Sequence, residues 1–332
     1  MTRYVFKHLG CSRYLFDYSI NKNMSDTQSA NQELLLKPGT LWTRIQEQTQ
    51  HGLECGALQS IATDYEFVEQ NGVNFLVRIL SNLTRKDEAK KKQDKAAKKG
   101  KDFNPFLPYE QDLFVSDISQ THLCLLNKFN VVENHLLIVT REFEEQESLL
   151  NWQDFQAMWA CLAEIDGLAF YNGGKIAGAS QRHKHLQVVP TPLAPNQTES
   201  IPIAPLFASA VFEGDVGRIP DLPFVHGFCW FDANLINSIN DAAQTTLELY
   251  YKILKAVDLF NQDTENNNSI AYNFLATREW MFIVPRSEEN FESISVNSLG
   301  FAGGLLVRNQ EQMQMLKECQ PMEILKRVGV SK

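Results

Sequence analysis

The chain has 332 residues, 44% of them hydrophobic and 21% charged, and its 40 acidic against 31 basic residues give a formal net charge of −9. This composition excludes collagen-like, low-complexity and wholly disordered chains, and the acidic balance argues against a general nucleic-acid binder. No stretch reaches the roughly 18 consecutive apolar residues that a membrane-spanning helix requires, so neither a membrane nor a nucleic acid is expected as a partner.

Cysteine usage points to a reducing compartment. Six cysteines stand at positions 11, 55, 124, 161, 229 and 319, and no two of them have CxxC spacing. This pattern argues against a zinc ribbon and against a disulfide framework, and it favours core thiols. Because the N-terminus also lacks an apolar run followed by a small-residue cleavage site, we expect a cytoplasmic protein.

The first helical pattern begins near residue 40. Before it, residues 1–34 are predicted to form an N-terminal tail, and an over-long start ahead of Met24 is the alternative. The helix is predicted over residues 40–52, capped near Thr40.

A hairpin is predicted next, because the hydrophobic period changes to two. Tyr65 and Phe67 alternate with other residues before Asn71-Gly72, and the alternation then resumes at Val73, Phe75, Val77 and Ile79. Asn-Gly is preferred in two-residue hairpin turns, where both positions need φ > 0. A β-sheet therefore starts here.

A lysine-rich segment interrupts the sheet. Residues 85–101 hold nine Lys or Arg against three acids, so the rest of the chain carries −9 − 6 = −15. The segment lacks apolar periodicity and stacking aromatics, which favours a mobile, solvated insertion over about 85–104 rather than a nucleic-acid-binding arm.

An order of elements occurs twice in the remaining chain. Two apolar segments, HLCLLNKF and HLLIVT, form another predicted hairpin, and a helix with one apolar stripe starts at Trp152. A strand, a glycine-rich loop and the strand HKHLQVVP follow. After a Pro-rich connection over 191–206, a helix at about 241–260, the strand SIAYNFLAT and the strand WMFIVPR repeat this order. We interpret this as a diverged duplication in which Trp280, Met281 and Phe282 occupy the place of the histidines.

The strand HKHLQ carries the candidate chemistry. Residues two apart on a strand share a face, so His183, His185 and Gln187 form one polar face, with Lys184 on the other side. Upstream, Gly173, Gly174 and Gly178 allow the backbone to approach a ligand and turn N–H groups toward it, as phosphate-binding loops do. Ser180 and Gln181 add side-chain donors.

This pattern suits nucleophilic attack on phosphorus by His185. A neutral imidazole forms a phosphoramidate that a second nucleophile can discharge, and the carbonyl of His183 is the expected anchor for its other nitrogen. At position 187 an amide can donate a hydrogen bond to a phosphate oxygen but cannot shuttle a proton, which favours transfer over hydrolysis. A metal site of the cupin type is the alternative, but the histidines at 8, 51, 122, 135 and 226 show no metal spacing.

The residues N-x₅-G-A-S-Q-R-H-K-H-L-Q from Asn172 to Gln187 resemble the histidine-triad (HIT) superfamily. The HKHLQ form is similar to its transferase branch, the diadenosine tetraphosphate phosphorylases or ATP adenylyltransferases. The resemblance extends to the segments LLNKFNVVENHLLIVT, YNFLAT, WMFIVPR and SVNSLGFAGGLLV, and so covers most of residues 60–310.

The resemblance implies an α+β fold of HIT-like antiparallel sheets with helices, in two diverged HIT-like halves. The catalytic half is expected over residues 35–195, and a second half of the ATP adenylyltransferase C-terminal type over 196–332. The family's nucleophile falls on His185, its amide partner on Gln187 and its nucleotide-binding asparagine on Asn172. Its remaining nucleotide contacts fall on Lys86, Asn127, Lys128, Gly178, Ala179, Ser180, Gln181, Asn297, Ser298, Leu299, Gly304 and Arg308.

Two departures from the family pattern are expected. Arg308 stands where relatives carry lysine, which keeps a cation but changes its geometry. Arg182 occupies a position that is not basic in relatives. Both concern affinity for the acceptor end of the substrate rather than the chemistry.

The implied reaction is phosphorolysis of diadenosine tetraphosphate to ATP and ADP, with reverse adenylyl transfer, through an adenylyl-histidine. Its ligands are diadenosine polyphosphate, ATP, ADP, AMP and phosphate, with a divalent cation, Mg²⁺, accompanying the polyphosphate and no protein-ligated metal. A monomer or a small homo-oligomer is expected. Three rivals remain: a uridylyltransferase acting on sugar phosphates, although Lys184 replaces the proline usual between its histidines; a triad hydrolase, which requires histidine at 187; and a non-enzymatic nucleotide sensor.

Overall fold

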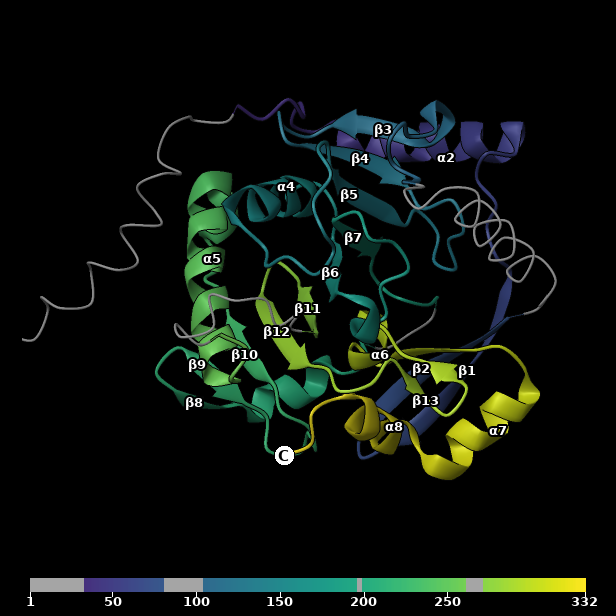
Figure 1. The fold of residues 1–332 in the computed structure, drawn as a ribbon, viewed down its shortest axis with the longest axis vertical. Coiled ribbons are helices and arrows are strands. Elements are labelled where there is room, and N and C mark those ends of the chain that lie inside the picture. The colour runs from purple at the N-terminus through teal and green to yellow at the C-terminus, as the bar shows by residue number, and fades with distance from the viewer. Residues whose placement is uncertain (1–32, 81–103, 196–198, 261–270) are drawn as a thin grey trace, which may run out of the picture. The chain divides into compact units, whose positions relative to one another are not determined.

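One ten-stranded sheet organises both halves of the sequence (Figure 1). The computed structural model describes residues 33–80, 104–195, 199–260 and 271–332, so most of the expected tail and of the lysine-rich insertion lies outside the described residues. All neighbouring strands of the sheet are antiparallel. In spatial order they are β3 (Phe114–Asp117), β4 (His122–Leu126), β5 (Leu136–Thr140), β7 (His185–Pro190), β6 (Gly167–Gly173), β11 (Tyr272–Ala276), β12 (Trp280–Pro285), β10 (Gly227–Trp230), β9 (Val216–Arg218) and β8 (Val211–Glu213).

The predicted duplication is confirmed by this strand order. The first copy runs β4, β5, α4 (Trp152–Leu162), β6, β7, and the second runs β9, β10, α5 (Ile239–Ala256), β11, β12. In space the copies read β4-β5-β7-β6 and β9-β10-β12-β11, so they have the same topology. They join at β6 and β11, where Asn172 is paired with Asn273.

The strand registers correct one expectation about the second copy. Phe170 pairs with Gln187, so the same register brings Asn172 opposite His185, and the equivalent Asn273 pairs with Val284. Val284, rather than Trp280, Met281 or Phe282, therefore stands in the place of His185. The sequence prediction aligned the two copies on the prolines that end these strands, but the two prolines are not equivalent. Pro190 pairs with Gly167 at the start of β6, and Pro285 pairs with Tyr272 at the start of β11, next to Asn273.

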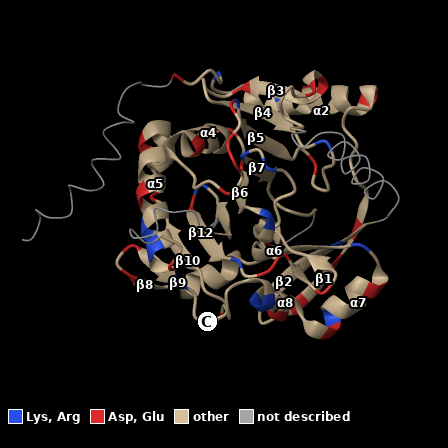
Figure 2. Cartoon of the chain, in the orientation of Figure 1, with Lys and Arg blue, Asp and Glu red and all other residues tan. Residues whose placement is uncertain are grey.

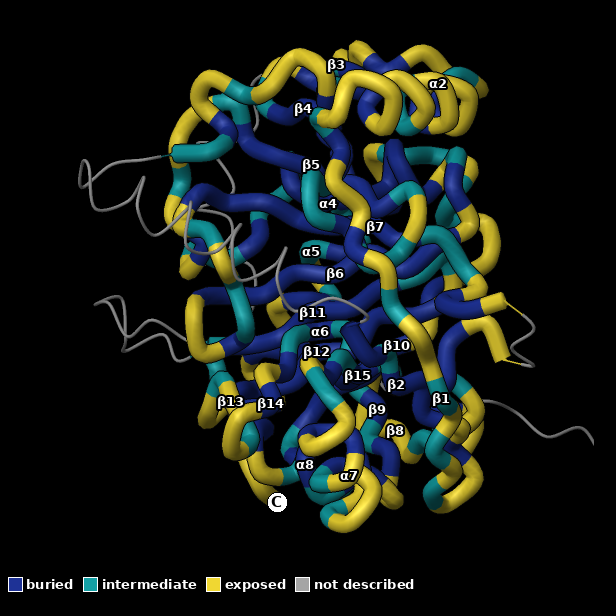
Figure 3. Tube along the Cα trace, turned by 90° about the vertical axis from the view of Figure 1, so that its right-hand side faces the viewer, coloured by how far each residue is buried: buried dark blue, intermediate teal, exposed yellow. Residues whose placement is uncertain are grey.

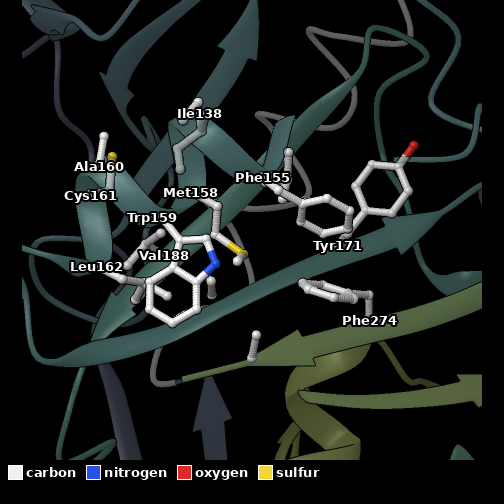
Figure 4. Packing of buried hydrophobic residues seen from close by; sticks show 14 of the residues in the cluster. Ile138, Phe155, Met158, Trp159, Ala160, Cys161, Leu162, Tyr171, Val188 and Phe274 are labelled. Carbon is white, nitrogen blue, oxygen red and sulfur yellow. The ribbon is translucent and has the colours of Figure 1, made fainter. Parts of the chain in front are cut away.

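Helices α4 and α5 pack against each other and against one face of the sheet. A capping box of Asn151 and Asp154 starts α4. Its apolar stripe is core, as predicted: Phe155, Met158 and Trp159 lie against side chains of the strands (Figure 4). The thiols of Cys124, Cys161 and Cys229 are buried, and Cys55 is exposed.

The opposite face of the ten-stranded sheet is covered by a smaller sheet and three helices, through a second apolar cluster. The predicted hairpin is confirmed, and its turn residues Asn71 and Gly72 have φ of 53° and 79°. A late strand of the chain pairs in parallel with the second hairpin strand. These elements are β1 (Thr63–Gln70), β2 (Val73–Leu80), β15 (Gly304–Val307), α6 (Ser298–Phe301), α7 (Gln310–Cys319) and α8 (Pro321–Val328).

The first helix, α2 (Leu41–Cys55), is confirmed and extends beyond the predicted residue 52. Thr40 is its N-cap residue, but the Thr40 hydroxyl donates to the carbonyl of Lys37. The carboxylate of Glu164 instead accepts from the N–H groups of Gly39 and Leu41.

The remaining short elements are β13 (Asn290–Phe291), β14 (Ile294–Ser295), η1 (Gln111–Leu113), η2 (Lys175–Ala177), η3 (Ala204–Ser209) and η4 (Leu235–Asn237).

Charge and burial follow this layering. Charged residues lie mainly in the helices and connections, whereas the central strands are mostly uncharged (Figure 2). Strands β5, β6 and β11 are buried along their length, as is β7 except for the half-buried Pro190 at its end (Figure 3). Within the described ranges, no helix combines the length and apolar character that a bilayer crossing demands.

Candidate active site

His185 is the first residue of β7 and is only 5% exposed. Its Nδ1 donates to the carbonyl oxygen of His183 at 2.8 Å, which confirms the expected anchor. Burial lowers the pKa of His185 to about 4, so the ring is neutral near pH 7. Its Nε2 makes no hydrogen bond with any described residue and is therefore available as a nucleophile.

The backbone of His185 is held by a glutamine side chain. Gln146 accepts from the His185 N–H at 2.8 Å and donates to the carbonyl oxygens of His185, at 3.1 Å, and Asn172, at 3.0 Å. The paired register of β6 and β7 extends only to Phe170 and Gln187. The side-chain amide of Gln146 thus bridges β6 and β7 where their pairing ends, and it satisfies the buried backbone groups beside His185.

His183 is bound on both ring nitrogens. Its Nε2 lies 2.8 Å from the carbonyl oxygen and 2.9 Å from the hydroxyl of Thr140, and its Nδ1 lies 2.7 Å from Asn104 Nδ2. The ring of Phe106 contacts both histidines, with centroids 5.6 Å from His183 and 5.4 Å from His185. His183 therefore has no free nitrogen for the two-histidine metal site considered as an alternative.

A group of possible metal ligands does occur at the surface. His51 and Cys55, one turn apart on α2, and Asp112 on η1 have ligand atoms within 4.8 Å of one another. The His51 ring nitrogen and the Asp112 carboxylate are already 2.9 Å apart. Among the described residues this is the one such group, and it includes neither histidine of the HKH strand.

Lys184, directly before β7, points away from the face of His185, as predicted, and it contacts Asp154 of α4. It is 1% exposed, and its Nζ lies 2.7 Å from the fully buried carboxylate of Asp154 and 3.0 Å from that of Glu144. Burial alone would lower the pKa of Lys184, but the charge of Asp154 raises it overall. His122 Nε2 approaches the second Asp154 oxygen at 3.0 Å. The ion pair fixes the strand from behind.

The glycine-rich loop differs in part from the expected phosphate cradle. The N–H groups of Gly178 and Ala179 donate to carbonyl groups within the loop itself, at 2.9 and 3.1 Å. The N–H groups of Ser180 and Gln181 have no partner among the described residues, so the donors available to an anion lie at this end of the loop. Gly178 has a φ of 91°, and a Cβ there would lie 2.9 Å from that of Asn297.

Residues of the second half hydrogen-bond to the side chain of Asn172. Asn172 Oδ1 accepts from the N–H of Ser298 at 2.9 Å, from its hydroxyl at 2.7 Å and from Asn273 Nδ2 at 3.0 Å. Arg286 donates to Asn273 Oδ1 at 2.6 Å and to the loop carbonyl of Ala177 at 3.3 Å. The Asn172 oxygen is thus fully used, which leaves its amide nitrogen without a described partner.

Comparison with known families identifies this arrangement. The family model described as Ap4A phosphorylase N-terminal domain matches residues 31–209, and the model described as ATP adenylyltransferase C-terminal domain matches residues 220–331. The chain belongs to the Ap4A phosphorylase family. The implied class, nucleotidyltransferase, follows from this membership.

Relatives of the Ap4A phosphorylase family agree in sequence and fold. Diadenosine 5′,5‴-P1,P4-tetraphosphate phosphorylase 2 of Saccharomyces cerevisiae is 28% identical over 276 residues, which are 75% of this chain and 81% of that protein. The crystal structure of yeast Ap4A phosphorylase Apa2 has a TM-score of 0.73 at 22% identity, over 90% of this chain and 96% of that one. The structure of Apa2 in complex with Ap4A also has a TM-score of 0.73 at 22% identity, over 89% and 99%. The expected HIT-like fold of two diverged halves is confirmed.

Within this Ap4A phosphorylase fold, the predicted site residues fall into two sets. Those that lie together in the structure are Asn172, Gly178, Ala179, Ser180, Gln181, His185, Gln187, Asn297, Ser298 and Leu299, with Asn127 linked to Gln187 through His135. Lys128 is instead ion-paired with Glu110. Gly304 starts β15 and lies beside Leu299, since a Cβ on Gly304 would be 3.4 Å from the Leu299 carbonyl oxygen, whereas Arg308 is exposed after the end of β15. Lys86 lies outside the described residues.

Four residues of this candidate site were missed from the sequence: His135, Gln146, Asn273 and Arg286. Each acts through a contact with a residue distant in the chain. One signal was present for Asn273, since Tyr-Asn occurs at 171–172 and again at 272–273. His135 and Arg286 stand at the ends of the segments HLLIVT and WMFIVPR, whose pattern predicts only strands, and Gln146 lies in a connection with no repeated or spaced pattern.

Proposed function

We propose that this chain splits diadenosine tetraphosphate with phosphate, giving ATP and ADP, and that His185 carries the adenylyl group between the two steps. The free Nε2 of a neutral, anchored imidazole is the observation that supports this assignment. Family membership and the likeness to a diadenosine tetraphosphate phosphorylase support the substrate.

In the first step, Nε2 of His185 attacks the α-phosphorus, and the bond from that phosphorus to the bridging oxygen of ATP breaks. The Nδ1 proton stays on the ring. The carbonyl oxygen of His183, which accepts a hydrogen bond from it, stabilises the positive charge that forms on the imidazole. The N–H groups of Ser180 and Gln181 and the Gln187 amide are proposed to donate to the non-bridging oxygens, where such donors stabilise developing charge.

In the second step, a phosphate oxygen attacks the adenylyl-histidine, the P–N bond breaks and ADP leaves with a neutral imidazole restored. Gln187 cannot accept a proton from an attacking water, which disfavours hydrolysis. Phosphate is already ionised and needs no such base. The proposed outcome is therefore transfer to phosphate.

The substrate side of the proposal includes Asn172, Asn297, Ser298 and Leu299 as nucleotide contacts. Asn127, Lys128, Lys86, Gly304 and Arg308 are proposed from the family resemblance alone. Mg²⁺ enters with the polyphosphate as part of the substrate and offsets its charge. We further propose a cytoplasmic enzyme, monomeric or a small homo-oligomer, with nucleotides and phosphate as its ligands.

The decisive experiment replaces His185 by alanine and by glycine. Incubation with diadenosine tetraphosphate labelled in the α-phosphate should leave labelled adenylate on the wild-type chain and none on either variant, and phosphorolysis should fall by about 10⁴-fold or more, because the nucleophile is removed. His51→Ala, at an exposed histidine, is the control and should keep both signals. Undiminished labelling or turnover in the His185 variants would refute the proposal.

A further inference from the structure

We infer that His135 is a positioning residue that locks the Gln187 amide in one orientation, with its NH₂ group turned to the substrate phosphate. This inference deepens the proposed function and rests on it. It assigns a role to a histidine that neither the motif nor the glycine-rich loop contains.

A chain of hydrogen bonds carries the inference. His135 Nε2 lies 2.9 Å from Gln187 Oε1, and His135 Nδ1 lies 3.2 Å from Asn127 Nδ2. His135 is buried next to β5, and Leu137 of that strand pairs with Gln187 on β7. The rings of His135 and Phe170 are in contact, with centroids 5.7 Å apart, which restricts rotation of the imidazole.

The direction of each hydrogen bond follows from the donor inventory. Burial lowers the pKa of His135 to about 4, so the ring is neutral and has one donor and one acceptor. An amide nitrogen can only donate, so Asn127 Nδ2 makes Nδ1 of His135 the acceptor. The proton is therefore on Nε2, where it is donated to Gln187 Oε1. With its oxygen occupied, Gln187 presents the amide nitrogen, which has no partner among the described residues.

Asn127 is itself oriented by the backbone. Its Oδ1 accepts from the N–H of Phe129 at 3.2 Å, which directs the Asn127 nitrogen toward His135. The Phe129 N–H thus orients Asn127, Asn127 fixes the tautomer of His135, and His135 fixes the orientation of Gln187. A reversed Gln187 would place a carbonyl oxygen against phosphate oxygens, where it repels charge instead of stabilising it.

The kinetic test compares His135→Leu with His135→Gln, each alone and combined with Gln187→Leu. Because Gln187 loses its fixed orientation, His135→Leu should lower kcat for phosphorolysis by about tenfold or more with KM changed less than about threefold. His135→Gln offers an amide N–H near the Nε2 position and should recover kcat to within about threefold of wild type. In the Gln187→Leu background, His135→Leu should have less than about a twofold further effect. A full further loss there would overturn the inference, because His135 would then act other than through Gln187.

A second measurement needs neither a variant nor turnover. In wild-type enzyme labelled with ¹⁵N-histidine, long-range proton–nitrogen correlation should give His135 a protonated Nε2 and an unprotonated Nδ1. The opposite tautomer would overturn the inference. If His185→Ala retained phosphorolysis, the proposed function would fail while this spectrum stayed as expected, so the two failures are distinguishable.

Discussion

In the proposed mechanism, His185 and Gln187, two side chains on one face of β7, have different roles: His185 forms the bond to phosphorus, and Gln187 donates to a non-bridging oxygen. His185 is prepared by burial and by the His183 carbonyl, which together leave one neutral, unbonded nitrogen. Gln187 has no proton to exchange and is tied to His135. In that proposed mechanism, the choice between phosphate and water therefore depends on the residue at 187.

Replacing Gln187 by histidine should raise water-dependent cleavage relative to phosphorolysis. An imidazole can accept a proton from attacking water, and general-base assistance contributes about 10²-fold or more. The measurement is the ratio of AMP to ADP formed from diadenosine tetraphosphate at fixed phosphate. The control Gln187→Met, which is of similar length and can neither accept a proton nor carry a charge, tests whether any change at this position suffices, and an unchanged ratio in Gln187→His would contradict the role given to Gln187.

For single residues, the sequence predicted which side chains share the face of His185, but it did not predict the residues that hold them in place. His183, His185 and Gln187 share a face because strand side chains alternate, which is a local rule. Gln146 and His135 reach the site through pairings between strands and connections far apart in sequence. A single sequence contains no measure of such contacts.

Strand β7 is held from its two faces by different means. On one side it carries the neutral His185 and Gln187, and on the other Lys184, directly before β7, is paired with the buried Asp154 of α4. Asp154 also accepts from the N–H of Asn151 in the capping box, so one carboxylate both starts α4 and anchors β7. Asp154 thus couples the start of α4 to the position of His185, the neighbour of Lys184.

Lys184→Met should lower the free energy of unfolding by about 3–5 kcal/mol, because it leaves the buried Asp154 carboxylate without its main counter-charge. Urea unfolding at pH 7 measures the change. Lys252→Met removes one partner of the exposed pair with Asp215 and should cost less than about 1 kcal/mol. Equal effects of the two substitutions would show that the buried pair is not special.

Elements with a local signature were predicted well. The hairpin follows from Asn71-Gly72, and α4 follows from its apolar stripe. The parallel pairing of β15 with β2 was not predicted, because the two strands are more than two hundred residues apart. The cap of α2 was missed for the same reason, since Glu164 supplies it from another element.

At the scale of the molecule, three of the buried histidines among the described residues make stability depend on pH. Burial lowers the pKa values of His135, His185 and His226 to about 4, below the ordinary value of 6.5. Between these values the unfolded chain binds more protons than the folded chain, so the free energy of unfolding rises with pH across this window and is lost on acidification. Each histidine contributes up to about 1.4 kcal/mol per pH unit.

Urea unfolding at pH 6.5 and at pH 5 should therefore show a clear loss of stability at the lower pH, before most carboxylates titrate. Histidine proton exchange followed by NMR in the folded state should give no titration of His135 or His185 between these values. Stability that is equal at the two pH values would count against neutral burial of these rings.

The seam between β6 and β11 has a consequence for the first half of the chain. The two halves proposed at 35–195 and 196–332 share one ladder, and the asparagines at its centre come from equivalent positions. A lone first half would present a bare edge, open to self-association, and would lose the Ser298 and Asn273 donors that orient Asn172. The second copy, which has Val284 in the place of His185, therefore supports the first copy, because without it Asn172 would lose the donors that orient its side chain.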